Sequence, residues 1–394
     1  EAVVYSSAVK EDNPELQAAH DANLPIYKRA EMLAFLMSLK KSVGVAGSHG
    51  KTTTSGMMSL MLENCGLDPT IIIGGTLPQI QSNAKSGKGD FLIAEADESD
   101  GTFLLLHPKI AVITNIERDH LDHYQCLDNI VEAFETYLRQ LPADGMAIVC
   151  LDCQQVVDLQ AKVPCNYLTY ALTNPNADFT ARDIRHNQLG VAAEIYHQGN
   201  LLGTLQLQVP GEHNISNALA SIALGISLGL PFSQLAKALL DFHGTGRRYE
   251  LLGEVDGIKV IDDYAHHPTE IKATIKAAKD LGAERLITVF QPHRYTRTQA
   301  LYKEFAGAFA LSDVIIINEI YGAFEKPIPG VTAHLLVDEI KATTDKEYVE
   351  YAATLDDTLD AVRHYAKSGD VVLVMGAGNI RQIGERFVEE RQSR

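Results

Sequence analysis

The chain has 394 residues, and 34 lysines and arginines against 51 aspartates and glutamates give it a net charge of −17. This balance excludes a nonspecific nucleic-acid-binding protein, which would need a broad basic face, and any anionic ligand must therefore meet a local cationic site. Apolar residues make up 46% and charged residues 22% of the sequence, which excludes a disordered chain, and the length indicates two or three domains.

Two further features bear on where the protein works. No run of about 18 apolar residues occurs, so we expect no segment inserted in a membrane. The five cysteines are few, odd in number and unpatterned, which fits a reduced, cytoplasmic setting better than a disulfide framework. Cys150 and Cys153 form a CxxC pair, but no second pair follows at zinc spacing, so core packing is the favoured interpretation.

Residues 1–40 look like the end of an α/β domain. Strands are expected at 2–7 and 25–27, a helix opens at Pro14, and a second helix covers 30–39. The sequence opens inside the first strand without a methionine. We therefore expect residues 1–40 to be the remainder of an N-terminal domain whose start lies before residue 1.

The most informative stretch of the chain covers residues 41–65. An apolar strand at 43–46 leads into GSHGKTTT at 47–54, after which a helical pattern of apolar residues begins. The two glycines permit a sharp turn in which several backbone N–H groups and the positive end of the helix dipole face one concavity suited to phosphate. Lys51 would add a mobile cation, and the hydroxyl of Thr52 would hold magnesium. Only two residues separate Gly47 from Gly50, fewer than in a Walker A loop, so a plain glycine turn before a core helix is the alternative.

Apolar strands and helices then alternate in two α/β units. The first, at 41–248, has expected strands at 70–73, 91–95, 110–115 and 146–150, and helices at 127–141, 213–229 and 232–242. Period-two segments at 179–209, separated by turn signals at 187–190 and 197–200, predict an antiparallel insertion in this unit. The second, at 249–394, has expected strands at 259–262, 286–290, 314–317 and 371–375, and helices at 268–281, 298–310, 355–364 and the end of the chain. Continuous apolar strands of this kind predict parallel sheets buried on both faces.

Ligands of such sheets bind beyond the carboxyl ends of the strands, so the residues there are candidates for chemistry. Two strand ends carry acids and imidazoles: Glu95, Asp97, Glu98 and Asp100, then Glu117, Asp119, His120, Asp122 and His123. Facing a triphosphate at Lys51, these groups would hold one or two magnesium ions. Solvated loop acids and capping residues are the alternative.

Later polar residues each admit two interpretations. Asn214 precedes an expected helix, where it is either an N-cap or a ligand for the edge of an adenine. Arg247 and Arg248 are either part of a solvated linker or a clamp for phosphates. Arg294 and Arg297 follow a strand and suit a small carboxylate, with surface salt bridges as the alternative.

Together these motifs resemble those of one family. Eight of them occur in the order seen in Mur ligases: AGSHGKTTT, EADESD, TNIERDHLDHY, GEHNISNALA, GTGRRYE, DDYAHHPTEI, FQPHRYTRT and VMGAGNI. The resemblance covers nearly the whole chain and implies an α/β protein of three domains. These are a truncated N-terminal Rossmann-like domain, a central P-loop ATPase domain with an antiparallel insertion, and a C-terminal Rossmann-like domain.

The resemblance implies an ATP-dependent amide ligase of cytoplasmic peptidoglycan precursor synthesis. Such an enzyme phosphorylates the lactyl carboxylate of UDP-N-acetylmuramate, and the amine of L-alanine then displaces phosphate from the acyl phosphate. Phosphorylation supplies the leaving group that a carboxylate lacks, while magnesium and Lys51 offset the developing charge. The implied ligands are ATP, Mg²⁺ and the two substrates. The oligomeric state is left open, and a homo-oligomer is compatible with the sequence.

The resemblance also implies roles for the nucleotide and metal ligands. The phosphates would be cradled by Gly47, Ser48, His49, Gly50, Lys51, Thr52 and Thr53. Asn214 would meet adenine, Arg248 the phosphates, and Asp263 the ribose. Magnesium would be held by Thr52, Glu95 and His120, and the catalytic residues would be Lys51 and His120.

The alanine pocket implied by the resemblance consists of Tyr264, His266, Arg294 and Arg297, with the arginines on the carboxylate. Two positions depart from the family pattern. Ser48 stands where threonine is usual, and Ala265 stands where glycine is usual, which puts the backbone turn at 265 in question.

Three other functions remain as alternatives. A folylpolyglutamate synthetase-like ligase is disfavoured by the HRYTR stretch at 293–297. A nucleotide-driven switch would hydrolyse ATP in response to a protein partner rather than to an amino acid. A dehydrogenase would rest on residues 376–378 alone, which form only half of a dinucleotide fingerprint.

Overall fold

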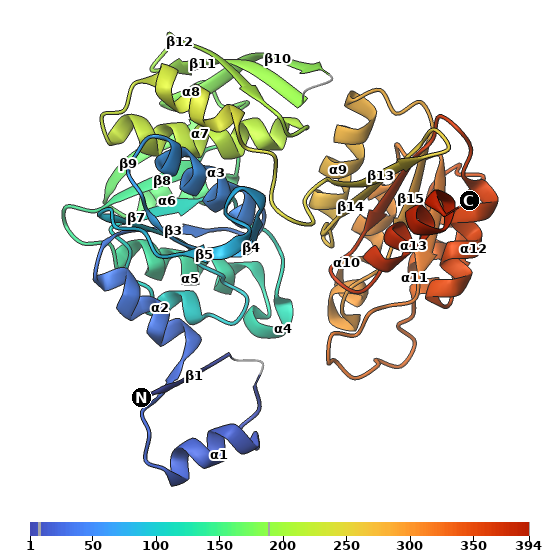
Figure 1. Cartoon of the computed structure of the whole chain (residues 1–394), viewed down its shortest axis with the longest axis horizontal. Coiled ribbons are helices and arrows are strands. Elements are labelled where there is room, and N and C mark those ends of the chain that lie inside the picture. The colour runs from blue at the N-terminus through green and yellow to red at the C-terminus, as the bar shows by residue number, and fades with distance from the viewer. Residues whose placement is uncertain (7–8, 188–189, 394) are drawn as a thin grey trace.

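The computed structural model describes residues 1–6, 9–187 and 190–393. Figure 1 shows a central unit, blue to yellow, beside a C-terminal unit, orange to red, with a small N-terminal segment next to the central unit. We use the names N-terminal segment, central unit and C-terminal unit for residues 3–38, 41–240 and 250–392. The first predicted turn of the antiparallel segment, at 187–190, lies partly outside the described residues. Among the described helices, none combines the length and apolarity needed to cross a bilayer.

The N-terminal segment contains the four elements that the sequence predicts. Its strands β1 (Val3–Tyr5) and β2 (Ile26–Lys28) pair in parallel, and its helices are α1 (Pro14–Asp21) and α2 (Arg29–Ser38). Helix α1 begins after Asn13, whose side chain accepts a hydrogen bond from the N–H of Glu15 at 2.9 Å. Helix α2 attaches the segment to the central unit by burying Met37 in an apolar cluster of that unit.

The central unit is built on one ten-stranded sheet. Its strands are β3 (Lys41–Ala46), β4 (Thr70–Leu77), β5 (Ser82–Lys85), β6 (Phe91–Glu95), β7 (Ile110–Ile113), β8 (Met146–Cys150), β9 (Asn166–Ala171), β10 (Phe179–Asn187), β11 (Gly190–His197) and β12 (Asn200–Leu207). They lie in the order β12-β11-β10-β9-β8-β7-β3-β6-β4-β5. Strand β10 pairs in parallel with β9, so the predicted antiparallel segment β10–β12 extends the same sheet.

Helices cover both faces of this sheet, as its continuous apolar strands predict. One face carries α3 (Lys51–Asn64), α7 (Glu212–Ser227) and α8 (Phe232–Leu240), and the other carries α2, α5 (Leu127–Arg139) and α6 (Gln154–Lys162). Shorter turns are η1 (Pro78–Ile80), η2 (Thr102–Leu105) and α4 (Leu121–Tyr124). The predicted parallel sheet is confirmed, whereas β5, α6 and β9 were not predicted.

The C-terminal unit repeats the doubly wound plan with six strands. They are β13 (Glu250–Val255), β14 (Ile258–Asp263), β15 (Leu286–Phe290), β16 (Val314–Asn318), β17 (Tyr348–Ala352) and β18 (Val371–Met375), in the order β13-β14-β18-β15-β16-β17. Only β13 runs antiparallel to its neighbour. One face carries α9 (Pro268–Asp280), α10 (Tyr295–Ala308) and α11 (Ala333–Thr343), and the other carries α12 (Leu355–Tyr365) and α13 (Arg381–Gln392). The elements β13, α11 and β17 were not predicted.

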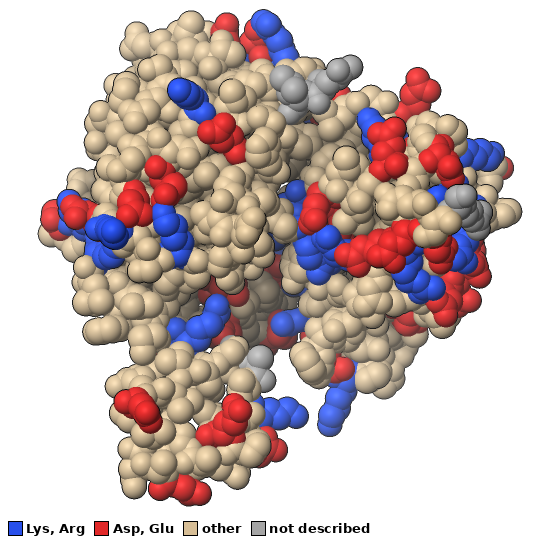
Figure 2. All heavy atoms as spheres, viewed as in Figure 1, with Lys and Arg blue, Asp and Glu red and all other residues tan. Residues whose placement is uncertain are grey.

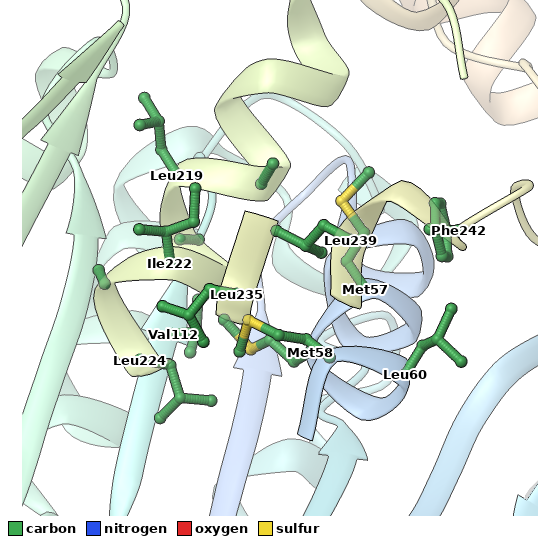
Figure 3. Packing of buried hydrophobic residues seen from close by; sticks show 14 of the residues in the cluster. Met57, Met58, Leu60, Val112, Leu219, Ile222, Leu224, Leu235, Leu239 and Phe242 are labelled. Atoms are coloured by element: carbon green, nitrogen blue, oxygen red, sulfur yellow. The ribbon is translucent and has the colours of Figure 1, made fainter. Parts of the chain in front are cut away.

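Helix α3, which follows the glycine loop, is held on several sides. The core around it is shown in Figure 3 by Met57, Met58 and Leu60 of α3, Leu219, Ile222 and Leu224 of α7, and Leu235 and Leu239 of α8. Gly56 permits the close approach of the chain after α8, because a Cβ there would lie 2.9 Å from Thr245 Cγ2. Burial of this kind fixes the start of α3, and with it the glycine loop.

A pair of adjacent leucines tests this packing. Leu239 is fully buried, whereas 37% of Leu240 is exposed. Leu239→Ala should lower the free energy of unfolding of the central unit by about 2–5 kcal/mol, because it opens a cavity against α3. Leu240→Ala should cost about 1 kcal/mol or less. Urea denaturation, monitored by hydrogen exchange of the α3 amides, measures the free energy of unfolding of both variants. Equal losses of stability would contradict the packing of Leu239 against α3.

Candidate active site

The loop between β3 and α3 has the strand, glycine turn and helix that the sequence predicts. Gly47 and Gly50 have φ values of +136° and +82°, a region that favours glycine. A Cβ at Gly47 would lie 2.1 Å from Thr114 Oγ1, and a Cβ at Gly50 would lie 2.8 Å from Asn217 Oδ1. Both glycines are therefore required by conformation and by contact.

The direction of the loop amides differs from the prediction. The N–H of Ser48 donates to the carbonyl of Asn115 at 3.0 Å, and the N–H of His49 donates to Asn115 Oδ1 at 2.8 Å. These two amides therefore face the end of β7 instead of an open concavity. The amides free to bind an anion are those of the first turn of α3, which have no acceptor within the helix.

Lys51 lies folded against its own loop. Its Nζ donates to the carbonyl of Gly47 at 2.6 Å and to Glu98 at 2.9 Å. Burial opposes the charge of Lys51, but Glu98, Asp97 and Glu95 outweigh this effect and raise its pKa above the usual range. Burial raises the pKa of Glu98 to about 7, although Lys51 works in the opposite direction. The ammonium group is thus held beside the loop by a buried acid.

The three predicted metal ligands are only partly brought together. Thr52 Oγ1 donates to Glu95 Oε2 at 2.9 Å, and this hydroxyl and carboxylate are the hard oxygen donors that magnesium prefers. His120 instead forms a group with Asp97 and Glu98, and its Nε2 lies 3.8 Å from Glu98 Oε1. Burial lowers the pKa of His120. Thr52 and Glu95 therefore fit a magnesium ion, and His120, in contact with Glu98, lines the same cleft.

Asn214 is not the N-cap of its helix, so that alternative is wrong. The N-cap of α7 is Gly211, with φ +91°, and Asn214 lies inside the first turn. Its Nδ2 donates to the carbonyl of Pro210 at 2.7 Å, and its Oδ1 accepts from Asn217 Nδ2 at 3.2 Å. Asn217, which sequence reasoning missed, is three residues on, and this spacing places both amides on one helix face.

A cavity of about 190 Å³ lies next to the glycine loop. Its lining includes His49, Gly50, Thr52, Thr53, His213, Asn214, Asn217, Arg248, Tyr249 and Asp263. Asp263 accepts hydrogen bonds from the N–H groups of Tyr249 and Ala265, and burial raises its pKa to about 6. Ala265 is absent from the described residues with positive φ, so alanine fits this turn without strain.

A larger cleft of about 630 Å³ opens between the units. Predicted residues that line it are Ser48, His49, Gly50, Lys51, Thr52, Glu95, His120, Arg248, Tyr264, His266, Arg294 and Arg297. Figure 2 shows basic and acidic side chains around the hollow where the N-terminal segment and the two units meet. The candidate phosphate loop and the candidate carboxylate-binding arginines therefore share one cleft.

The two adjacent arginines point to different neighbours. Arg248 lies 5.2 Å from the ring of Tyr264 and 3.7 Å from Glu270 Oε1, beside both cavities. Arg247 donates to Asp262 and to the carbonyl of Gly376, at 3.3 and 2.8 Å. The pair is not a solvated linker, and only Arg248 of the two lines the cavity of about 190 Å³ next to the glycine loop.

His266 is held in one orientation at the cleft. Its Nδ1 lies 2.9 Å from the carbonyl of Tyr264, and its backbone N–H donates to Glu270 Oε2 at 2.9 Å. Burial lowers the pKa of His266 to about 4, so the imidazole is neutral at pH 7.

The candidate carboxylate-binding arginines are both paired with acids of the central unit. Arg297 donates from Nε and Nη2 to Asp119 Oδ1 at 3.0 and 2.9 Å, and both side chains are buried. Arg294 donates from Nη1 to Asp122 Oδ2 at 3.0 Å, and its buried Nε has no partner within the described residues. The surface salt bridge expected as the alternative is thus, for Arg297, a buried contact between units.

Family models match most of this chain. The description "Mur ligase family, catalytic domain" matches residues 1–41, "Mur ligase middle domain" matches 45–225, and "Mur ligase, glutamate ligase domain" matches 247–378. The UDP-N-acetylmuramate–L-alanine ligase of Pelotomaculum thermopropionicum is 50% identical over 387 residues, which are 98% of this chain and 84% of that protein. The chain belongs to the Mur ligase family.

Other Mur ligases also match nearly the whole of this chain, at lower identity. The UDP-N-acetylmuramate–L-alanine ligase of Desulforamulus reducens is 45% identical over 394 residues, all of this chain and 85% of that protein. The crystal structure of the corresponding Thermotoga maritima ligase has a TM-score of 0.83 at 29% identity, over 100% of this chain and 85% of that one. A Thermotoga maritima MurF ligase solved in complex with ADP shares the fold, with a TM-score of 0.75 at 19% identity, over 100% and 96% of the chains.

In this Mur ligase, Asp119 also lines the cleft, although sequence reasoning placed it only in a cluster of acids. Its Oδ1 accepts from the backbone N–H of His120 as well as from Arg297. Burial alone would raise the pKa of Asp119, but Arg297 and neighbouring histidines hold it well below the usual range. Asp119 thus connects the C-terminal unit to the candidate metal ligand His120.

The two arginine pairs should differ in their effect on stability. Arg297→Ala would leave the carboxylate of Asp119 buried without its partner, and it should lower the free energy of unfolding by about 3–5 kcal/mol. Arg294→Ala removes a half-exposed pair and should cost about 1 kcal/mol or less. Thermal and urea unfolding of the full chain measure both. Similar losses for the two variants would contradict the distinction.

Proposed function

We propose that this Mur ligase is the ATP-dependent enzyme that joins L-alanine to UDP-N-acetylmuramate through an acyl phosphate, in cytoplasmic peptidoglycan precursor synthesis. Its near full-length similarity to ligases named for this substrate pair supports the assignment. The observation that carries the mechanism is the shared cleft, where the loop at Lys51 faces Arg294 and Arg297. The five cysteines are free, in keeping with a reduced compartment.

Activation of the carboxylate depends on the loop and the start of α3. The first-turn amides and Lys51 would bind the phosphates of ATP, and Lys51 must leave Glu98 and the carbonyl of Gly47 to reach them. Thr52, Glu95 and His120 would hold magnesium, which neutralises phosphate charge when bound. Asn214, Asp263 and Arg248 would bind adenine, ribose and phosphate respectively, from the adjoining cavity and the cleft.

The second substrate would bind on the C-terminal side of the cleft. The unpartnered Nε of Arg294 suits the carboxylate of alanine, whereas the fork of Arg297 is already filled by Asp119. Arg297 therefore shapes the pocket by holding the units together. The neutral imidazole of His266 would accept a hydrogen bond from the amino group, and Tyr264 would close the pocket.

The distribution of apolar clusters along the chain bears on its division into domains. We propose boundaries at 1–40, 41–248 and 249–394 for the UDP-sugar-binding, ATP-binding and amino-acid-binding domains. The boundary at 248 is supported because each of the four apolar clusters of the described chain has its buried residues on one side of it.

The reaction is tested by phosphate release from ATP with Mg²⁺ and UDP-N-acetylmuramate while amino acids are scanned one by one. L-alanine should give the highest rate, and Lys51→Ala should lower kcat about 100-fold or more, because a cation near the transferred phosphate is lost. Lys341→Ala, an exposed lysine on α11, is the matched control. Phosphate release that ignores amino acids, or a Lys51→Ala enzyme of near-normal rate, would overturn the assignment.

Arg294→Ala separates amino-acid binding from nucleotide binding. The variant loses a charged hydrogen-bond donor, so kcat/KM for alanine should fall about 10- to 100-fold, mostly through KM. The KM for ATP should stay within about twofold, since Arg294 does not line the cavity of about 190 Å³ that contains Asn214 and Asp263. An equal rise in the KM for ATP would place Arg294 outside the alanine pocket.

A further inference from the structure

Two histidines and a glutamate from distant parts of the chain meet where the two units touch. His49 belongs to the loop before α3, Glu117 follows β7, and His267 precedes α9 of the C-terminal unit. The histidine side chains are only 10% and 6% exposed, and Glu117 is 34% exposed. The proposed reaction assigns no role to Glu117 or His267, so this group needs its own account.

The three donor atoms have the spacing of a metal centre. His49 Nε2 lies 3.5 Å and His267 Nδ1 lies 3.8 Å from the same atom, Glu117 Oε2, and all three lie within 4.8 Å of one another. In a tetrahedral zinc site with bonds of about 2.0–2.1 Å, neighbouring ligand atoms are about 3.3–3.4 Å apart. The two distances to Glu117 Oε2 exceed this spacing by a few tenths of an ångström, and the two imidazole nitrogens lie within 4.8 Å of each other, so a small contraction would close the group around an ion.

Neighbouring groups orient the donors toward that centre. His49 Nδ1 lies 3.2 Å from Glu270 Oε1, and His267 Nε2 lies 3.3 Å from the carbonyl of Arg118. Thr269 Oγ1 donates to Glu117 Oε2 at 2.6 Å. Histidines that bind metals usually donate their other ring N–H to a carboxylate or a backbone carbonyl, which leaves the inner nitrogen available.

The inner nitrogens have little else to bind. Within the described part of the chain, His49 Nε2 is buried without a hydrogen-bond partner. His267 Nδ1 accepts from the N–H of Thr269 at 3.4 Å, a long contact at the start of α9 that a metal bond would replace.

We propose that His49, Glu117 and His267 form a binding site for a transition-metal ion of the zinc type. Two imidazoles and one carboxylate are a zinc ligand set, with a fourth position left for water, whereas magnesium prefers oxygen donors. The site shares no ligand with the Thr52 and Glu95 pair. Because His267 belongs to the C-terminal unit, a bound ion joins the two units directly and opposes their separation.

The competing explanation needs no metal. An imidazolium at His49 between Glu117 and Glu270 would account for the same contacts, and those carboxylates raise the pKa of His49 to about 9 against the effect of burial. The two accounts differ in one measurable respect. Only the metal site gives a zinc affinity that depends on His267.

The test uses the full chain, stripped of metal and titrated with Zn²⁺ in equilibrium dialysis. We expect one ion that His267→Gln and Glu117→Gln each weaken by at least about tenfold, and that excess Mg²⁺ does not displace. Glu270→Gln keeps all three ligands and should weaken binding by about 10- to 100-fold through His49. His107→Gln, at an exposed histidine, and Cys153→Ser are the matched controls and should bind as the parent chain does.

Cobalt distinguishes the site from the thiols. Co²⁺ in place of zinc should give visible absorption typical of tetrahedral nitrogen and oxygen ligands, without a thiolate charge-transfer band in the near ultraviolet. Absence of binding by the parent chain, equal binding by His267→Gln and His107→Gln, loss of binding in Cys153→Ser, or a thiolate band would each overturn the proposal.

Discussion

The candidate site depends on the hydrogen bonds that fix the glycine loop to the residues directly after β7. Thr114 Oγ1 and Asn115 Nδ2 both donate to the carbonyl of His49, at 2.6 and 3.0 Å, while Asn115 accepts the amides of Ser48 and His49. Because β6 and β7 flank β3 in the sheet, their terminal acids face the same loop. Hydrogen bonds between neighbouring strand ends thus decide where Lys51 and Thr52 begin their helix, and the C-terminal unit completes the cleft around them.

Most of the fold was predictable because its central strands are apolar along their whole length. β3, β6, β8, β15 and β18 were found within a few residues from this feature alone. The missed elements lie at edges or on surfaces. The sequence of β5, Ser-Asn-Ala-Lys, has no apolar pattern and is a strand only because it pairs with β4. β13 buries a single side chain, Val255, so its alternation is too weak to read. Tertiary pairing, not local preference, creates these strands.

The residue types of the candidate site could be predicted from the sequence, but the contacts between its side chains could not. Strand ends with acids, imidazoles and arginines were identifiable because ligands of α/β sheets bind there. That Arg297 binds Asp119 could not be read from sequence, since the two are 178 residues apart and belong to different units. The same holds for the contact of His120 with Glu98, since the two residues follow different strands of the sheet. Only Asn217 carried a local indication, its three-residue spacing from Asn214.

At the cleft, the two units of the described chain are joined by ion pairs and not by a shared hydrophobic core. The Arg294–Asp122 contact is half exposed, so dissolved electrolyte weakens it over a screening length of about 8–10 Å. The Arg297–Asp119 contact is buried, so high salt screens its electrostatic attraction much less. Rising ionic strength would therefore act on the interface in two stages. It would first weaken the half-exposed Arg294–Asp122 contact at the rim of the cleft, and only at much higher salt the buried Arg297–Asp119 contact.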